Sequence, residues 1–351
     1  PKTGPGKPMI NERGKPYFEK VHTPEEAALK KRLHATQRDI KAGHYKPYFD
    51  VSKRYDVDVS KYPAGKTTLK EAVPRTEKSM EKYENLIKEL GPEMKKRLRA
   101  VFKKGDKIPN SEDWYFMGQL EKEFIGELGE EAGRARFKYQ FADSMAATTG
   151  GADPTSNFRM AMYGNYLEAN KLPFPEHGYQ MPHPIGGRYV GGNMAQRKKM
   201  AETNQAGTWT GFEPRKNPKR HNFSRDFIGD EMAGTIDEQM STAMVPGMKL
   251  PPGPSYGLYE GVMHQVAKQQ GVAPRGFQDV AWAGAKGMDE GKPMIQVTNE
   301  SIERTARETG LTPKEVVIQG IIHSRIPMYG TAGLLGMGAM NEAMNTEAPG
   351  A

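Results

Sequence analysis

Hydrophobic residues recur every three or four positions along much of the chain, which is the spacing of one face of an α-helix. The clearest stretch is 222–244, N-F-S-R-D-F-I-G-D-E-M-A-G-T-I-D-E-Q-M-S-T-A-M. Its apolar positions are Phe223, Phe227 and Ile228, followed by Ile236, Met240 and Met244. This stretch therefore predicts two short amphipathic helices joined through Gly229 and Asp230.

The same spacing predicts helices on both sides of this stretch. Thr23-Pro24-Glu25-Glu26 and Thr312-Pro313-Lys314-Glu315 have the pattern of a capping box, in which Thr and Glu satisfy free backbone N–H groups. Further stripes begin at Trp114, Phe137, Phe158, Tyr259, Phe277 and Val316. No alternation typical of strands persists beyond a few residues, so we expect a mostly α protein.

Proline and glycine divide this helical pattern. Gly91-Pro92 predicts a break that splits 75–104 into a pair of helices, because proline inside a helix removes a hydrogen bond. The segment 171–221 is rich in Pro and Gly and reads as a long loop, a length that is often functional or mobile. We predict an N-terminal arm over 1–110, a helical body over 111–326 and a flexible Gly/Met-rich tail over 327–351.

Charge is unevenly distributed. Residues 1–110 contain 27 Lys and Arg against 15 Asp and Glu, a net charge of +12, and the remainder carries −4. A basic arm on a nearly neutral body is typical of contact with a polyanion such as DNA, although a solvated tail without a specific partner has the same composition.

A second basic patch lies within the predicted body. Residues 188–225 contain nine Lys and Arg against two acids. The candidates for phosphate contacts are Arg188, Arg197, Lys198, Lys199, Arg215, Arg220 and Arg225. The helix at 95–104, K-K-R-L-R-A-V-F-K-K, has two interpretations: it tracks phosphates, or it is the outer face of a core helix.

Composition limits the remaining classes. Hydrophobic residues make up 36% of the 351 positions, which is low enough to suggest that part of the chain is extended or disordered. There is no cysteine, which excludes disulfides and cysteine-bound zinc. No apolar run is long enough for a membrane-spanning helix. The first residues lack the apolar core of a secretory signal, so we expect a protein that is not secreted by a signal peptide.

Aromatic residues alternate with Lys and Asp over 44–63. They are Tyr45, Tyr48, Phe49, Tyr55 and Tyr62. Such aromatics can stack on bases. No regular stacking interval is present, so the pattern favours an extended segment that is anchored to a neighbouring surface.

Three motifs carry little chemistry. G-G-R-Y-V-G-G at 186–192 lacks the Gly-Lys-Ser/Thr ending of a phosphate loop and reads as a flexible loop. His177 and His183 have a spacing that fits no helical pair of metal ligands, so we expect no metal and no other cofactor. No pattern of a Ser-His-Asp triad is present.

Asp237 is the strongest candidate for a catalytic residue. Either Thr235 or Asp237 can cap the helix that follows, and the helix dipole favours an ionised carboxylate at that end. Acids are common in first helical turns, so a purely capping role is the alternative.

Three segments, taken in order, resemble one family. They are F-A-D-S-M-A-A-T-T-G-G-A-D-P-T-S-N-F-R-M-A at 141–161, F-I-G-D-E-M-A-G-T-I-D-E-Q-M at 227–240, and Y-G-L-Y-E-G-V-M-H-Q-V-A-K-Q-Q-G-V-A-P-R-G-F-Q-D-V-A-W at 256–282. They resemble the opening helices, the segment around the catalytic Asp and the closing helices of the helix-hairpin-helix DNA glycosylases, in a divergent bacteriophage branch. The resemblance extends over roughly residues 111–290 and implies a location in a host cytoplasm or a virion.

The chain departs from that family at several positions. The Leu-Pro-Gly-x-Gly hairpin expected about twenty residues before the Asp is absent, and G-T-W-T-G-F-E-P-R-K-N-P-K-R stands in its place. Gln239 replaces the His that follows the family's Asp, and Thr242 stands where its Arg would be. These departures bring the standard DNA clamp into question.

The resemblance implies chemistry at a nucleobase that is flipped out of the helix. Asp237 would stabilise positive charge at C1′ and orient water, and Lys216 or Lys219 could instead attack C1′ as an amine. Transfer of a group to a base would use the same Asp.

The competing hypothesis is a non-enzymatic virion-associated protein. In that case a degenerate glycosylase-like module would bind DNA, other virion proteins or further copies of the chain.

Overall fold

The computed structural model describes residues 8–10, 16–18, 24–50, 77–109, 111–175, 190–214, 216–247, 256–287 and 292–328. These residues are mostly α-helical, as predicted. Two short strands, β1 (Pro8–Ile10) and β2 (Pro16–Phe18), pair antiparallel with Pro8 opposite Phe18. None of the described helices combines the length and the apolar composition that crossing a membrane requires.

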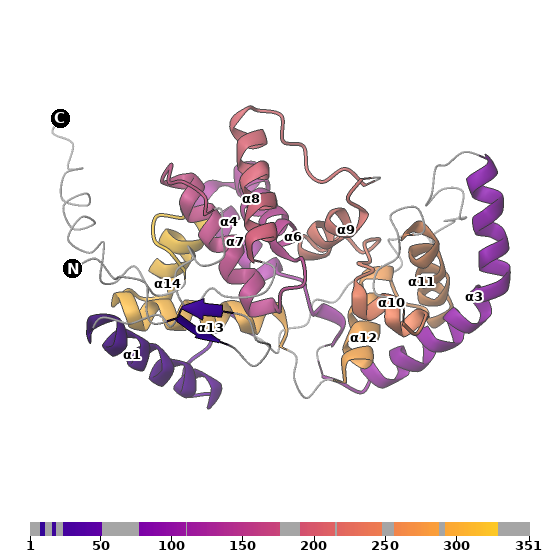
Figure 1. Cartoon of the computed structure of the whole chain (residues 1–351), viewed down its shortest axis with the longest axis horizontal. Helices are drawn as coiled ribbons and strands as arrows, with labels where there is room; N and C mark the ends of the chain where they lie inside the picture. Colours follow the sequence, from indigo (N-terminus) through magenta and orange to yellow (C-terminus); the bar gives the residue numbers. More distant parts are fainter. Residues whose placement is uncertain are drawn as a thin grey trace.

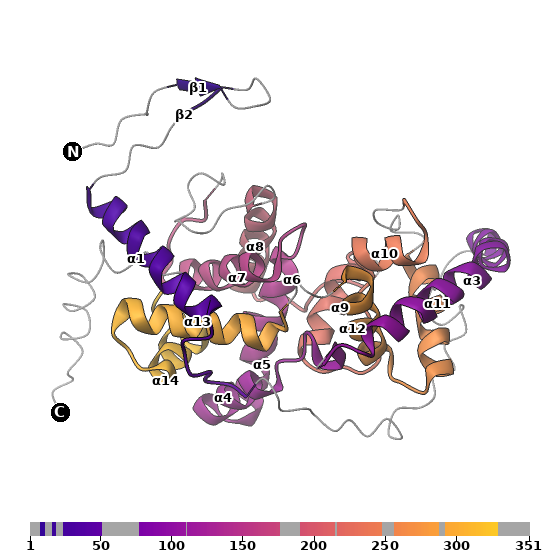
Figure 2. The ribbon, with the colours of Figure 1, turned by 90° about the horizontal axis from the view of Figure 1, so that it is seen from below.

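The helices form two groups that lie side by side (Figures 1 and 2). The first group consists of α3 (Glu77–Gly105), α10 (Glu238–Met244), α11 (Tyr256–Gln270) and α12 (Pro274–Lys286). Within it, α3 packs against α12, and the two backbones come very close to each other. A Cβ at Gly105 would lie 1.8 Å from the Val280 carbonyl oxygen, and one at Gly284 would lie 1.9 Å from that of Val101. Glycine at both positions lets the two backbones touch.

The predicted break at Gly91-Pro92 is wrong, because α3 is one continuous helix with Pro92 inside it. Pro92 is exposed, whereas Met94 and Leu98 are buried. The apolar face therefore continues past the proline, and Figure 1 shows that α3 bends around the group. Helix α3, which falls within the predicted arm, packs against α10, α11 and α12 of the predicted body.

The second group forms the other side of the molecule. Its helical elements are α1 (Pro24–Lys41), α4 (Gly118–Leu128), α5 (Glu130–Arg136), η3 (Phe137–Asp143), α6 (Ser144–Thr148), α7 (Pro154–Ala169), α8 (Val190–Gln205), α13 (Met294–Thr309), α14 (Pro313–Val316) and η6 (Val317–Ile322). The short element η2 (Ser111–Asp113) packs against α12 of the first group. The predicted capping box at Thr312 and Glu315 is present. Between the groups lies α9 (Pro218–Phe227).

Helix α8 corrects the prediction of a loop over 171–221. Val190, Met194, Arg197 and Met200 are buried at intervals of three and four. Two glycines at its start and an arginine within the buried stripe concealed this periodicity in the sequence. The glycine-rich motif at 186–192 thus ends in a helix, and its first four residues lie outside the described part of the chain.

The segment after α1 is anchored to α13. Phe49 is buried, and its backbone N–H and C=O pair with the Asn299 side chain at 2.8 Å each. Arg307 also binds Asp39, at 3.2 Å, and the His44 carbonyl oxygen. The predicted anchoring is confirmed for Phe49, whereas Tyr55 and Tyr62 lie outside the described residues.

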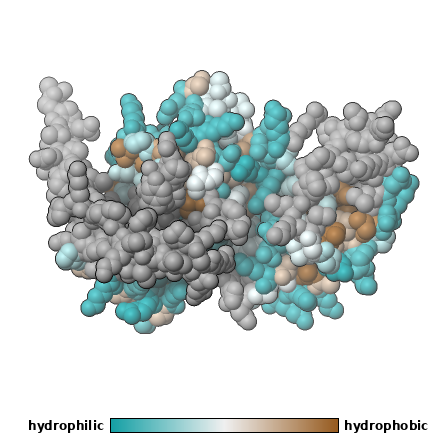
Figure 3. Space-filling model, in the orientation of Figure 1, coloured by the Kyte–Doolittle hydropathy of each residue, from teal (hydrophilic) through white to brown (hydrophobic). Residues whose placement is uncertain are grey.

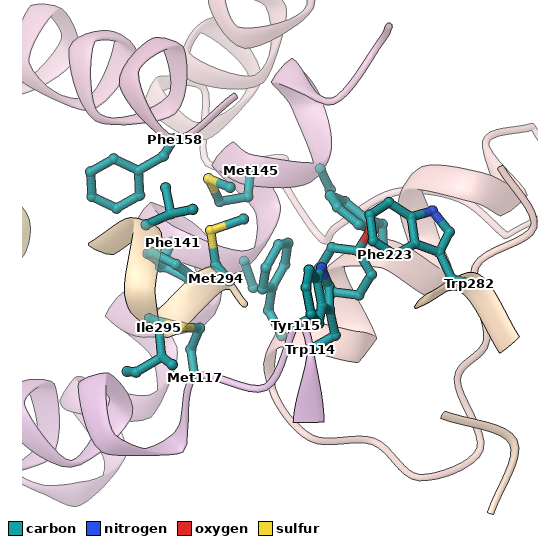
Figure 4. Close-up of a cluster of buried hydrophobic side chains, with 14 of the residues drawn as sticks. Trp114, Tyr115, Met117, Phe141, Met145, Phe158, Phe223, Trp282, Met294 and Ile295 are labelled. Carbon is teal, nitrogen blue, oxygen red and sulfur yellow. The ribbon is translucent and has the colours of Figure 1, made fainter. Parts of the chain in front are cut away.

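An aromatic cluster joins the two groups (Figure 4). Tyr115 lies edge-on to Phe223 and Trp282, with ring centroids 5.0 and 5.9 Å apart. Trp114 packs beside Trp282 at 5.6 Å. These contacts fix α12 and α9 on a common core, while the visible described surface is mainly hydrophilic (Figure 3).

Candidate functional site

A cavity of about 1000 Å³ lies where the two groups meet. Its wall includes the turn between α6 and α7, the first turns of α8, the starts of α9 and α10, and one face of α12. Residues from the N-terminal ends of α7, α8, α9 and α10 therefore line one space. Because the N-terminal end of a helix carries partial positive charge, this arrangement favours a negatively charged ligand.

Asp237 lies on the wall of this cavity and caps α10, as predicted. Its Oδ1 accepts a hydrogen bond of 2.9 Å from the Met240 backbone N–H. Its Oδ2 accepts one of 3.0 Å from the indole N–H of Trp282. The half-buried carboxylate is thus held in one orientation at the edge of the cavity.

Lys219, in the first turn of α9, also lines the cavity. Its side chain is half-buried, and burial lowers its pKa. The Asp237 carboxylate partly opposes this shift by raising the pKa, whereas the Arg220 guanidinium lowers it further. The structure therefore brings together two of the predicted site residues, an acid and an amine that is more easily deprotonated than an ordinary lysine.

Lys216 and Arg220 line the cavity beside Lys219. Lys216 is exposed and pairs with Glu213 at 2.7 Å. Arg220 is half-buried and donates to the Asn217 side chain at 3.3 Å, and burial lowers its pKa. The Asp237 carboxylate raises the pKa of Lys219, so these two groups interact electrostatically across the cavity wall.

One face of α12 contributes residues that the sequence interpretation assigned to the core or did not single out. Gln278, Trp282 and Lys286 recur every four residues and all line the cavity. The exposed fraction is 1% for Gln278 and 4% for Trp282, and Lys286 is half-buried. The Lys286 ammonium lies 5.0 Å from the Trp282 ring centroid, within the range of a cation–π contact. In the sequence, the four-residue spacing of a polar, an aromatic and a cationic residue was the signal that could have revealed this face of the cavity.

The turn between α6 and α7 closes another side. Asn193 on α8 donates to the Gly150 carbonyl oxygen at 3.0 Å, and a Cβ at Gly150 would lie 2.5 Å from Asn193 Oδ1. Asp153 caps α7 by accepting from the N–H groups of Thr155 and Ser156. A side chain at position 150 would therefore push the Asn193 amide out of its present position.

The prediction of phosphate contacts does not fit Arg197. Its side chain is fully buried and bonds to Glu168 and, at 2.8 Å, to Asn165. It lies against Gly164, where a Cβ would approach the Arg197 side chain to 2.5 Å. The correction is that Arg197 supports the packing of α8 on α7 and is closed to phosphates.

The remaining predicted cations lie elsewhere. Lys198 and Lys199 are exposed on α8 and do not line the cavity. Arg225 is directed to Asp230, at 2.7 Å. Arg188 and Arg215 lie outside the described residues.

A buried carboxyl group lies behind the cavity wall. Asp226 accepts a hydrogen bond of 2.6 Å from Thr235, which lines the cavity. Burial raises the pKa of Asp226 to about 7, although Thr235 and Arg275 act in the opposite direction. Arg275 is itself buried and pairs with Glu231 at 2.7 Å and Asp113 at 3.2 Å.

Among the described residues, no group of three His, Asp or Glu side chains could hold a metal ion. His177 and His183 fall outside this part of the chain. No protein-family model, no curated protein and no solved structure matches the sequence or the fold. The cavity with Asp237 and Lys219 is therefore assigned on its own geometry.

Proposed function

We propose that the protein binds DNA and acts on the N-glycosidic bond of a nucleotide flipped into the cavity. One observation carries this proposal: Lys219, with a lowered pKa, and Asp237, held by two hydrogen bonds, line the same cavity. A volume of about 1000 Å³ is within the range of small-molecule sites and accommodates a nucleotide.

Lys219 acts as the nucleophile in its neutral form. Its Nζ forms a bond to C1′ while the bond from C1′ to the base breaks, and the base leaves with the bonding electron pair and takes up a proton. The Lys219 nitrogen loses one proton, and opening of the sugar then gives an imine. The Asp237 carboxylate stabilises the positive charge that develops at C1′.

The cations around the cavity hold the phosphates on either side of this nucleotide. Lys216, Arg220 and Lys286 line the cavity, and the starts of α9 and α10 point into it. Each phosphate contact releases counterions, so DNA binding should weaken steeply as salt increases. The measurement is equilibrium binding to labelled duplex and single-stranded DNA across a salt series.

The chemistry is tested on DNA that contains an abasic site. The free aldehyde of that site condenses with the Lys219 amine to an imine and water, and borohydride reduces the imine to a stable protein–DNA adduct. We expect an adduct with the wild-type protein and none with Lys219→Ala. Lys216→Ala is the matched control, because Lys216 lines the same cavity but is exposed and paired with Glu213. An adduct that persists in Lys219→Ala and is lost in Lys216→Ala would assign the nucleophile to Lys216.

Asp237→Asn tests the acid separately. Asparagine keeps the size of the side chain and removes the negative charge. We expect release of a base to be abolished and DNA binding to stay nearly unchanged. Unchanged release would remove Asp237 from the mechanism.

A second candidate function is a non-enzymatic module that binds DNA or other virion proteins. The observation that favours it is that both carboxylate oxygens of Asp237 already accept hydrogen bonds within the protein. In that case Asp237→Asn would lower thermal stability, no adduct would form with abasic DNA, and salt-dependent binding would remain.

A further inference from the structure

Gln278 is a buried polar residue on the cavity wall whose acceptor has no partner. Its exposed fraction is 1%, it lines the cavity, and its Oε1 accepts no hydrogen bond in the protein. A buried acceptor without a partner destabilises the folded protein, so such groups usually serve a bound molecule or an ordered water.

The surroundings of Gln278 suit a flat ring. Trp282, Tyr115, Phe223 and Tyr256 all line the same cavity, and each is at most 5% exposed. Figure 4 shows Tyr115, Phe223 and Trp282 gathered at this junction.

The exposed fraction of the groups on this face of α12 increases along the helix. Gln278 is the most buried, Trp282 follows one turn later, and Lys286 is the most accessible. A nucleotide that enters with its base first would meet the amide at the base, the indole and Asp237 at the sugar, and the ammonium at a phosphate. The order of polar groups along the helix thus matches the order of groups in a nucleotide.

We propose that Gln278 is a specificity-determining residue, whose Oε1 accepts a hydrogen bond from an N–H group on the edge of the flipped base. This inference rests on the proposed function, since it assumes a nucleotide in the cavity. It adds the chemical feature by which a base is accepted, namely an N–H donor on its Watson–Crick edge. A base edge without such a donor would leave the buried acceptor unpaired and bind more weakly.

The experiment compares pairs of bases that differ in that donor. Duplexes carry one central adenine or purine, or one central thymine or N3-methylthymine, opposite an abasic position that favours flipping. Of the two pairs, the comparison uses the one whose natural base binds wild-type protein more tightly. In that pair, wild-type protein should prefer the natural base about 10- to 100-fold, because the analogue leaves one buried polar group without a partner. Gln278→Met keeps the length of the side chain and removes the acceptor, so the preference should fall to within about twofold.

Thermal unfolding supplies the second readout. Because the acceptor is unpartnered in the free protein, Gln278→Met should unfold at the same or a higher temperature than wild type. Gln140→Met is the matched control, since Gln140 is also buried but lies away from this cavity, and its amide donates to the Ile322 carbonyl oxygen at 2.7 Å and accepts from Arg136 at 3.3 Å. It should lower the unfolding temperature and leave the base preference intact.

The outcomes separate the two proposals. A wild-type preference that persists in Gln278→Met overturns the role of Gln278, as does the absence of any preference in wild type. Formation of the borohydride adduct by wild-type protein tests the catalytic proposal alone. A preference that is lost in Gln278→Met without any adduct supports base recognition by Gln278 in a protein that binds but does not cleave.

Discussion

The indole N–H of Trp282 donates a hydrogen bond of 3.0 Å to Oδ2 of Asp237. This bond joins α12 to the start of α10 and fixes the carboxylate from the side opposite to its own helix cap. It also places an aromatic face and a carboxylate next to each other on the cavity wall. The orientation of the proposed catalytic acid therefore depends on a residue 45 positions away in the sequence.

Trp282→Phe tests whether the hydrogen bond that orients Asp237 matters beyond the packing of the Trp282 ring. Phenylalanine keeps an aromatic ring and removes the donor, so Asp237 loses one of its two hydrogen bonds. We expect a loss of about 1–2 kcal/mol in the free energy of unfolding and a marked decrease in base release. The measurements are denaturant unfolding and the release assay. Trp114→Phe is the control, because the buried Trp114 indole N–H has no partner, and equal effects of the two substitutions would contradict the orienting role.

The sequence predicted the helical class and several caps because these features depend on neighbouring residues. Asp237, Asp153 and Thr312 cap helices as their local patterns indicate. The sequence also placed an acid and a lysine near each other in a candidate site. Helix caps involve residues two or three positions apart, which is why one sequence suffices to find them.

Features that depend on tertiary contacts were not predictable in the same way. The continuity of α3 through Pro92 follows from packing on α12, which no local pattern reveals. Arginine is a residue type that often contacts phosphates, yet in the fold Arg197 is buried and pairs with Glu168. Gln278 could be identified only from the structure, in which it lines the cavity and its Oε1 has no hydrogen-bond partner.

Gly284→Ala should disrupt the crossing of α3 and α12. The added Cβ would lie 1.9 Å from the Val101 carbonyl oxygen, so the backbones must separate. We expect a loss of about 1–3 kcal/mol or more in the free energy of unfolding. Gly126→Ala in α4 is the matched control, because nothing lies within 4 Å of its Cβ position, and it should stabilise the helix slightly. A neutral Gly284→Ala would mean that the helices do not cross this closely.

Arg197→Met should affect stability and leave the salt dependence of DNA binding unchanged. The substitution leaves Glu168 without its buried partner, and breaking a buried ion pair costs about 3–5 kcal/mol. The measurements are chemical unfolding and DNA binding across a salt series at a temperature where the variant is folded. Lys286→Ala should show the opposite pattern, with a shallower salt slope, because Lys286 lines the cavity and is one of the cations proposed to hold a phosphate. A shallower salt slope in Arg197→Met would return this residue to the DNA-binding surface.

Asp226 should make the stability of the protein depend on pH. Burial raises its pKa to about 7 in the folded state, against 3.8 for an unperturbed Asp. Between these values the folded state holds a proton that the unfolded state has released, so the contribution of Asp226 to stability falls as pH rises and levels off above about pH 7. Asp226→Asn still accepts the bond from Thr235 and cannot ionise. Relative to wild type, this variant should therefore gain stability from about pH 4 to pH 8, by at most about 4 kcal/mol. The check is thermal unfolding of both proteins across this range, and parallel curves would show that Asp226 titrates outside it.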